Sequence, residues 1–566
     1  MRKPLRRLLY LGAAAWLGFA VAAGALPAQA ADTPYKVLVF SKTAGFRHDS
    51  IAVGIQAIRD LGAANNFTVD ATEDANAFTT TNLAQYGAVI WLNTTGDVLN
   101  DTQQAAFQAY IGTGKGYVGV HSAADTEYGW SFYGSLMGAY FASHPAIQQA
   151  TINVENRGTA ATAHLGQTWT RTDEWYNYQT NVRSSGRVLM TLNESSYTGG
   201  SMGGDHPISW CKTHGGGRSF YTGLGHTQAT YAEAAFRSHL LGGIRYAAGK
   251  TKADCRAETG YTALYNGSTT GWSQAGPGSF TNSAATLTSV GGMGLFWYSA
   301  RAFTNYSLKL DWRMAGDDNS GVFIGFPPST DPWSAVNNGY EIQIDATDAA
   351  DRTTGAVYTF KSADIAARDA ALNPPGEWNT FELLVEGQRL RIYLNGVLVN
   401  DFTNTNPARN LDGHIGIQNH GDGDDVSFRN IRVRDLGGGS RTGPIRGLAS
   451  KCLDINGSGT ADGTKIQLYT CNGSGAQQWT LPGDGSIRGL GKCLDVRSSG
   501  TANGTFVQLW TCNGSGAQRW QADGSQRLVN PQSGRCMDVS GNNSADGTQI
   551  HIWDCHTGAN QRWILP

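Results

Sequence analysis

The sequence Cys493-Leu494-Asp495, followed downstream by Gln518-Arg519-Trp520, decides the fold of the last part of the chain. The same unit occurs as Cys452-Leu453-Asp454 and as Cys536-Met537-Asp538, and each copy ends in a Gln-x-Trp sequence. One copy has too little apolar surface to be stable alone, whereas copies packed around a common axis share one core. The spacing therefore predicts one three-repeat domain over residues 442–566. We expect its core to contain the tryptophans of the Gln-x-Trp sequences, Trp479, Trp520 and Trp563.

This repeat resembles the ricin B-type lectin β-trefoil, which implies a shallow sugar pocket in each copy. A carboxylate in such a pocket accepts hydrogen bonds from vicinal hydroxyls, and an aromatic face covers the apolar side of a pyranose. His551 stands where the other copies have Gln, and Ala476 and Ala517 stand where the third has Asn560. The matching carbohydrate-binding positions are Asp454, Gln467, Tyr469 and Gln477, then Asp495, Gln508, Trp510 and Gln518, and then Asp538, Trp553, Asn560 and Gln561.

The cysteine spacing predicts disulfides rather than a metal site. Six of the cysteines form pairs of identical spacing, one pair in each repeat, which is typical of an exported protein. These pairs are Cys452 with Cys471, Cys493 with Cys512, and Cys536 with Cys555. The remaining two, Cys211 and Cys255, could form a fourth bridge.

Before the repeats, a Gly-rich linker at 437–441 follows a region of β character over residues 256–436. Short alternating runs are separated by Gly, Asn and Asp turns, and Asn395-Gly396 is a hairpin turn between two apolar runs. The pattern predicts a β-sandwich. Within it, Glu341-Ile342-Gln343-Ile344-Asp345 places three polar side chains on one face of a strand and two isoleucines on the other. We expect Trp312 and Trp378 to belong to the core.

Several motifs of this region resemble the 3-keto-disaccharide hydrolase family, a concanavalin-like β-sandwich. They are Leu264-Tyr265-Asn266-Gly267, Asn319-Ser320-Gly321-Val322-Phe323, Gly339-Tyr340-Glu341-Ile342-Gln343-Ile344, Pro375-Gly376-Glu377-Trp378-Asn379, Ile415-Gly416-Ile417-Gln418-Asn419-His420-Gly421 and Phe428-Arg429-Asn430-Ile431.

The resemblance implies cleavage of a glycosidic bond in a sugar oxidised at C3. The ketone acidifies the C2 hydrogen, so a base can remove it while the anomeric oxygen leaves, and water can then add to the enone. Glu341 and His420 are the candidates for acid and base, and Gln343, Asp345 and Gln418 are candidates to position hydroxyls or a cation. The alternative is a sandwich that binds carbohydrate without catalysis.

Residues 31–250 alternate apolar strand runs with helical periodicity. Lys36-Val37-Leu38-Val39-Phe40 and Gly116-Tyr117-Val118-Gly119-Val120 are strand runs, whereas 50–61 and 102–111 have the helical period. The alternation predicts a parallel α/β sheet with helices on both faces and sites at the carboxyl ends of the strands. Several histidines stand where strands should end.

These residues resemble the ThuA-like (trehalose utilisation) family, which implies the class I glutamine amidotransferase fold. The motifs are Phe46-Arg47-His48, Gly119-Val120-His121-Ser122-Ala123-Ala124-Asp125-Thr126, Phe141-Ala142-Ser143-His144-Pro145, Asp173-Glu174-Trp175-Tyr176, Asp205-His206-Pro207 and Leu224-Gly225-His226. Amidotransferases have a nucleophilic Cys where this chain has His121, and no cysteine precedes Cys211. Glutamine hydrolysis by a thiol is therefore excluded.

The polar residues of these motifs predict either an acid/base cluster or a site for a divalent metal ion. A hydrogen-bonded polar network without turnover is the third interpretation. The candidate residues are His48, His121, Asp125, His144, Glu174 and His226.

The first 30 residues read as a signal peptide, with Arg2-Lys3 and Arg6-Arg7 before an apolar run and Ala28-Gln29-Ala30 at its end. An uncleaved membrane anchor is the alternative. Lys and Arg number 43 against 45 Asp and Glu, so a net charge of −2 provides no field for nucleic acid. We expect a secreted, extracellular protein with no membrane partner after signal cleavage.

Together these features predict a multi-domain, carbohydrate-active protein whose partner is a polysaccharide or oligosaccharide. An α/β domain and a β-sandwich would be tethered to that polymer by a β-trefoil. Two alternatives stay open, a non-catalytic glycan-binding protein and catalysis confined to the first domain. No Gly-x-Gly-x-x-Gly sequence follows a strand run, so a separate oxidoreductase would have to supply a 3-keto substrate.

Overall fold

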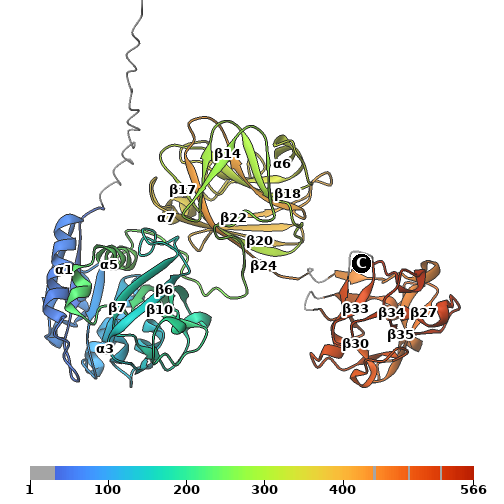
Figure 1. Ribbon diagram of the computed structural model, residues 1–566, viewed down its shortest axis with the longest axis horizontal. Helices are drawn as coiled ribbons and strands as arrows, with labels where there is room; N and C mark the ends of the chain where they lie inside the picture. The colour runs from blue at the N-terminus through green and yellow to red at the C-terminus, as the bar shows by residue number, and fades with distance from the viewer. Residues whose placement is uncertain (1–31, 438–440, 482–484, 523–525) are drawn as a thin grey trace, which may run out of the picture.

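The structure is a computed structural model that describes residues 32–437, 441–481, 485–522 and 526–566. The predicted signal peptide and residues 438–440 of the predicted linker lie outside the described residues. Figure 1 shows an α/β domain in blue and green, a β-sandwich in green and yellow, and an all-β domain in orange and red. Among the described residues, no helix combines the length and the apolar character that crossing a membrane requires.

The first domain is built on a nine-stranded sheet of order β2-β1-β3-β4-β11-β10-β9-β6-β7. The strands from β2 to β11 pair in parallel, as predicted, and the remainder pair antiparallel. The difference arises because short connections such as Gly215-Gly216, between β10 and β11, can join only antiparallel neighbours. The strands are β1 Tyr35–Phe40, β2 Phe67–Thr72, β3 Ala88–Leu92, β4 Gly116–Val120, β6 Gln148–Val154, β7 Thr168–Asp173, β9 Arg187–Leu192, β10 His206–His214 and β11 Gly217–Thr222, and β5 Phe141–Ser143 pairs with β8 Asn177–Tyr178.

Helices cover both faces of this sheet. The crossover from β1 to β2 runs in the opposite direction to that from β3 to β4, so right-handed connections place their helices on opposite faces. The helices are α1 Ile51–Ala64, α2 Thr80–Leu83, α3 Asp101–Gly112, α4 Ser131–Met137 and α5 Ala234–Ala247.

The second domain is a sandwich of an eight-stranded and a five-stranded sheet. Its main core contains Trp312, whereas Trp378 is buried beneath the guanidinium of Arg429. The large sheet comprises β12 Thr262–Tyr265, β14 Ser279–Ser283, β15 Thr286–Val290, β17 Tyr306–Met314, β20 Asn379–Glu386, β21 Arg389–Leu394, β22 Val397–Thr403 and β24 Val426–Asp435. The small sheet comprises β13 Trp272–Ala275, β16 Gly294–Tyr298, β18 Ser320–Phe326, β19 Tyr340–Ile344 and β23 His414–Asn419, and the helices are α6 Trp333–Asn338 and α7 Ile365–Ala371.

The third domain has the predicted β-trefoil organisation, in which each repeat contributes equivalent contacts. The indole N–H groups of Trp479, Trp520 and Trp563 donate to main-chain carbonyls at 2.9, 3.1 and 3.0 Å, and all three rings are buried in one core. The strands are β25 Arg441–Gly443, β26 Cys452–Ile455, β27 Thr464–Tyr469, β28 Trp479–Leu481, β29 Arg488–Gly489, β30 Lys492–Val496, β31 Val507–Trp510, β32 Gln521–Ala522, β33 Leu528–Asn530, β34 Arg535–Val539 and β35 Thr548–Trp553.

All the predicted disulfides are present, including the one between Cys211 and Cys255. That bridge ties β10 of the first domain to the segment that leads into the sandwich. The same segment is held by ion pairs, since Asp254 lies 2.9 Å from the Lys309 ammonium and Glu258 binds the Arg432 guanidinium at 2.6 Å. The connection between these two domains is therefore a packed, covalently fixed segment.

Candidate functional site

A pocket of about 260 Å³ lies on the outer face of the small sheet of the sandwich, beside α6. The alternation predicted for β19 explains its position. Ile342 and Ile344 enter the core between the sheets, whereas Glu341 and Gln343 point outward into the pocket. Gln418 at the end of β23 completes the polar floor.

The carboxyl group of Glu341 is surrounded by neutral groups. Burial raises its pKa to about 8, and a hydrogen bond from Gln418 opposes part of that rise. A glycine makes room for this side chain, because a Cβ on Gly321 of the neighbouring β18 would lie 2.8 Å from Cγ of Glu341. Within the described chain, the Oε1 atoms of Gln343 and Gln418 are buried without a hydrogen-bond partner. The pocket therefore holds a carboxyl group that titrates near neutral pH and two unused acceptors.

His420 lies at the mouth of this pocket, whereas Asp345 lies behind its wall. The imidazole of His420 lies at the exposed mouth, where its Nδ1 is 2.9 Å from Asp424. Asp345 does not line the pocket; its carboxylate accepts a hydrogen bond from Asn319 at 3.1 Å. The predicted acid and base candidates thus meet in one pocket, and Asp345 supports the wall from behind.

Five lining residues were absent from the predicted site, and three of them, Asn319, Trp333 and Tyr358, are polar or aromatic. Asn319 donates to Asp345 and accepts from Gln343, so it links the wall to the floor. Trp333 on α6 is 54% exposed at the rim, and Tyr358 lies in the loop after β19. Only Asn319 carried a sequence signal, since it begins one of the family-like motifs. An exposed tryptophan beside a polar pocket suits the apolar face of a sugar.

The second candidate site lies at the carboxyl ends of strands in the α/β domain. His121 follows β4 directly and adopts a positive φ of 49°, a conformation that a non-glycine residue seldom takes. His226 follows β11, and His48 lies in the loop between β1 and α1. Glu174 directly follows β7, which is the edge strand of the sheet. Its carboxylate nevertheless lies close to these three histidines.

Ligand-type atoms converge closely in this histidine cluster, defined as His48, His121, Glu174 and His226. One such atom from each residue lies within 4.8 Å of all the others. Nε2 of His121 is 3.1 Å from Nδ1 of His226 and 3.3 Å from Oε2 of Glu174, and that oxygen is 3.0 Å from Nδ1 of His226. The centroids of the imidazole rings of His48, His121 and His226 are 5.0 Å apart in each pair.

The surroundings fix the protonation of these groups. Burial alone would raise the pKa of Glu174, but the neighbouring imidazoles of His121 and His226 hold it well below its usual range. Burial and the neighbouring imidazoles lower the pKa of His48 to about 3. Burial opposes the charged form of His226, yet the Glu174 carboxylate raises its pKa overall.

The other two predicted members lie at the edge of the cluster. His144 is exposed and places Nδ1 3.0 Å from Oε1 of Glu174, so it caps the carboxylate from the solvent side. Asp125 is turned away, and its carboxylate accepts from the hydroxyl of Tyr128 at 2.6 Å. Asp173 was not among the predicted site residues. Its Oδ1 accepts a hydrogen bond from the main-chain N–H of His226 at 3.2 Å and so positions the loop that carries His226.

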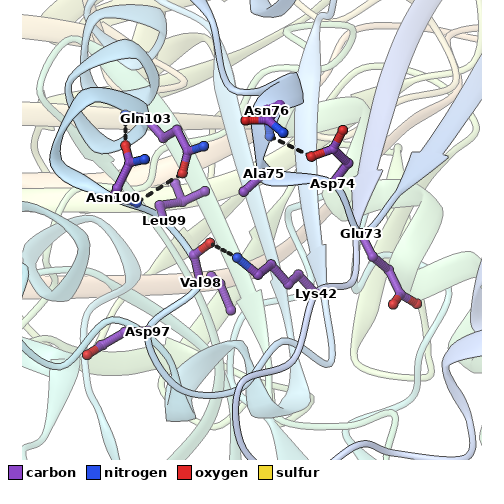
Figure 2. Close-up of a pocket in the computed structure, with 10 residues that line it drawn as sticks. All are labelled: Lys42, Glu73, Asp74, Ala75, Asn76, Asp97, Val98, Leu99, Asn100 and Gln103. Carbon is purple, nitrogen blue, oxygen red and sulfur yellow. Dashed lines mark hydrogen bonds between the residues drawn. The ribbon is translucent and has the colours of Figure 1, made fainter.

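A separate hollow of about 440 Å³ lies near the ends of β2 and β3 (Figure 2). Several of the polar side chains that line it form hydrogen bonds with nearby main-chain groups. Lys42 donates to the carbonyl of Val98 at 2.8 Å, and Asn100 and Gln103 form the capping box of α3. None of the four cluster residues lines it.

In the trefoil, the predicted sugar-binding aromatics Tyr469, Trp510 and Trp553 are 37%, 37% and 41% exposed. A pocket of about 600 Å³ lies in the second repeat. Asp495 lies at its base and accepts from the amides of Gln508 at 3.0 Å and Gln518 at 3.1 Å. Gln518 is itself buried, so it orients the carboxylate rather than lining the pocket.

The first repeat has the same pattern. Asp454 accepts from the amides of Gln467 at 2.9 Å and Gln477 at 3.0 Å, and Gln477 is buried. Its exposed aromatic is Tyr469.

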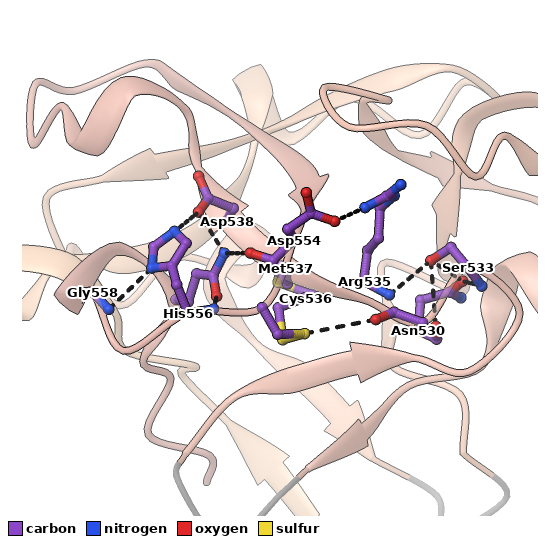
Figure 3. The surroundings of a disulfide bond; sticks show 12 residues. Asn530, Ser533, Arg535, Cys536, Met537, Asp538, Asp554, His556 and Gly558 are labelled. Atoms are coloured by element: carbon purple, nitrogen blue, oxygen red, sulfur yellow. Dashed lines mark hydrogen bonds and ion pairs between the residues drawn. A yellow bond between two sulfur atoms is a disulfide. The ribbon is translucent and has the colours of Figure 1, made fainter.

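The third repeat differs because imidazoles approach its carboxylate. Asp538 contacts His551 at 2.9 Å and His556 at 3.4 Å, and it also accepts from Asn560 at 2.7 Å and Gln561 at 2.8 Å. Figure 3 shows His556 against Asp538, beside the disulfide that begins at Cys536. His551 and Gln561 stand where the other repeats have their two glutamines, whereas Asn560 and His556 are additional partners of this carboxylate.

Three family models match successive segments of the chain and confirm the predicted resemblances. The ThuA model, described as trehalose utilisation, matches residues 36–247. The 3-keto-alpha-glucoside-1,2-lyase-like domain matches residues 260–434, and the ricin-type beta-trefoil lectin domain matches residues 441–563. These matches support a carbohydrate-active, carbohydrate-binding protein of several domains.

Individual proteins match over shorter or single-domain stretches. A glucan endo-1,3-beta-glucosidase of Cellulosimicrobium cellulans is 48% identical over 50 residues, which is 9% of this chain and 9% of that protein. A ThuA-like protein of Bacteroides uniformis ATCC 8492 superposes with a TM-score of 0.35 at 23% identity, over 39% of this chain and 94% of its own. A protein of Parabacteroides distasonis ATCC 8503, described as a glycosyl hydrolase, gives a TM-score of 0.27 at 23% identity over 31% and 99%.

Proposed function

We propose that this chain is a secreted enzyme that cleaves the glycosidic bond of 3-keto glycosides in the pocket of its β-sandwich. The observation that carries the proposal is the buried Glu341, whose pKa of about 8 allows it to act as a base near neutral pH. The match of residues 260–434 to the 3-keto-alpha-glucoside-1,2-lyase-like domain supports the substrate class.

In the proposed reaction, the Glu341 carboxylate removes the proton at C2, which the C3 ketone acidifies. The electron pair forms the C1–C2 double bond of the enone as the bond between C1 and the glycosidic oxygen breaks. The His420 imidazole, held by Asp424 at the mouth, donates a proton to the departing oxygen. Gln343 and Gln418 position the sugar through their unpaired amide oxygens. Water then adds to the enone and completes hydrolysis.

The trefoil would hold the enzyme on a polysaccharide. The open pocket of the second repeat, with Asp495 at its base and Trp510 exposed at its wall, supports binding of a sugar unit. Such a tether raises the local concentration of substrate without changing the chemistry. The four disulfides support an oxidising, extracellular location.

The test is to incubate the protein with 3-keto and unoxidised disaccharides and to follow the products by mass spectrometry. We expect release of a keto-hexose or its dehydrated form from the 3-keto substrate. Glu341→Gln should lower the rate by about 100-fold or more, the usual contribution of a positioned base. Glu386→Gln, on the exposed far sheet, is the matched control and should leave the rate unchanged.

Two outcomes would contradict the proposal. Equal release by Glu341→Gln would place the chemistry outside the sandwich pocket, and the first domain would become the candidate. Absence of release from every sugar, with retained binding to polysaccharide, would favour a non-catalytic glycan-binding protein.

A further inference from the structure

The geometry of the histidine cluster leaves a place for a cation. Nδ1 of His121 is 2.9 Å from the carbonyl oxygen of Gly223, which can only accept, so this nitrogen carries the proton. In the neutral ring, Nε2 of His121 is then a bare acceptor. It faces Oε2 of Glu174 at 3.3 Å, and that oxygen can also only accept. Two acceptors at this distance repel each other unless a proton or a metal cation lies between them.

One proton from His226 does not satisfy both acceptors. Nδ1 of His226 lies 3.0 Å from Oε2 of Glu174 and 3.1 Å from Nε2 of His121, so a single N–H would be shared between them. In the tautomer of His226 that carries its proton on Nε2, Nδ1 is bare and all three atoms present lone pairs to a common point. This is the arrangement that a metal ion requires.

The spacing of these atoms fits a transition-metal centre. Zinc binds imidazole nitrogen at about 2.0–2.1 Å, so neighbouring ligands of a tetrahedral ion lie about 3.3 Å apart. The three separations in the cluster, 3.0, 3.1 and 3.3 Å, are close to that value. His48 provides the fourth nitrogen, within 4.8 Å of the rest. A modest movement of its ring would bring it to the ion.

Surrounding groups orient the ligands as metal sites commonly require. The carbonyl of Gly223 fixes the tautomer of His121, and the hydroxyl of Ser122 lies 3.3 Å from Nδ1 of His48, which leaves Nε2 of His48 free. Tyr176 packs against His121 with ring centroids 4.1 Å apart. Asp173 holds the main chain of His226. Contacts with residues other than the four ligands therefore hold the ligand side chains in place.

We propose that His48, His121, Glu174 and His226 bind a single divalent first-row transition metal ion of the zinc class. Three imidazoles and one carboxylate form a ligand set that selects such an ion over magnesium or calcium, which prefer oxygen ligands. The cluster borders solvent at the exposed His144 and at His226, whose side chain is 19% exposed, and a water molecule or a sugar oxygen would reach the ion from this side. The proposal is independent of the reaction assigned to the sandwich.

The test uses the full chain after treatment with a chelator. Titration with Zn²⁺ in a calorimeter should give one tight equivalent per chain, and Co²⁺ should produce the visible absorption bands of a protein-bound ion. Glu174→Gln and His226→Ala should each weaken binding by more than about 100-fold, beyond the loss typical of removing an outer partner. His556→Ala is the matched control, because His556 and His551 meet Asp538 in the trefoil.

The proposal is overturned if the wild-type chain binds no equivalent of Zn²⁺ and shows no Co²⁺ absorption. It is also overturned if His556→Ala, rather than the cluster variants, removes the binding. Should a cluster variant fail to fold, the wild-type chain decides by itself, because Zn²⁺ must raise its unfolding temperature if the folded state alone holds the ion. An unchanged unfolding temperature at saturating Zn²⁺ contradicts the proposal.

Discussion

Glu341 in the sandwich pocket and Glu174 in the histidine cluster are equally exposed, at 7% each, yet their pKa values are shifted in opposite directions. Glu341 is surrounded by amides, and burial raises its pKa to about 8. Glu174 is surrounded by imidazoles, and these groups hold its pKa below the usual range. Burial favours the neutral carboxyl group in both regions, and it is outweighed only where imidazoles approach the carboxylate.

The difference suits two kinds of chemistry. A carboxyl group that gains and loses a proton near neutral pH can remove one from a substrate. A carboxylate that stays charged beside imidazole nitrogens can bind a cation. The same contrast recurs in the trefoil, where Asp495 meets two amides and Asp538 meets two imidazoles.

The largest expected effect concerns the pH dependence of keto-glycoside cleavage. Glu341 acts as a base only when ionised, so below its pKa of about 8 the active fraction falls about tenfold for each pH unit. Because half of Glu341 is ionised at pH 8, we expect kcat/KM to fall about 50-fold from pH 8 to pH 6. Replacing Gln418 by Leu removes a hydrogen bond that lowers this pKa and should move the profile to higher pH. A profile that is flat from pH 6 to pH 8 would exclude Glu341 as the base.

The second effect is on stability, and its sign follows from linkage. Between pH 4.5 and about 8 the folded state keeps a proton on Glu341 that the unfolded chain has lost, so stability falls as pH rises through this window. Glu341→Gln should remove that loss and stabilise the protein at pH 8 by a few kcal/mol, at about 1.4 kcal/mol per pH unit. Urea unfolding at pH 5 and pH 8 measures it. Equal stability of the two proteins at pH 8 would contradict the raised pKa.

The matched substitution in the histidine cluster should lower the stability of the protein instead of raising it. Glu174→Gln removes the ion pair with His226 and the contact with His121, so we expect metal-free protein at pH 7 to lose about 1–3 kcal/mol of stability. Chemical unfolding in the presence of a chelator is the measurement. If Glu174→Gln stabilised the fold as Glu341→Gln does, the imidazoles would not be partners of an ionised carboxylate.

The smallest effect is expected in the trefoil. Trp510→Ala should weaken retention on a polysaccharide column by about 2- to 10-fold, the value of one aromatic contact. Trp553→Ala should have less effect, because His556 lies against Asp538 in that repeat. His556→Ala should then increase retention through the third repeat. A larger loss from Trp553→Ala than from Trp510→Ala would reverse this order.

Several features could be predicted because they depend on short-range periodicity. The alternation along β19 assigned Ile342 to the core and Glu341 to the opposite face, and the structure agrees. The equal spacing of cysteines indicated one bridge in each repeat, and these bridges are present. The sheet of the first domain was predicted less well, since its antiparallel half depends on which strands meet rather than on the pattern within each strand.

The sequence by itself determined three domains, the faces of their strands and the residue types available for chemistry. Only the tertiary structure decided which of those residues meet. Glu174 ends a strand at the sheet edge, yet the chain carries it back to His121 and His226. Asp125, close to His121 in sequence, turns away to Tyr128. The physical reason is that local periodicity fixes the direction of a side chain relative to its own strand, whereas convergence depends on long-range packing of loops from separate strands.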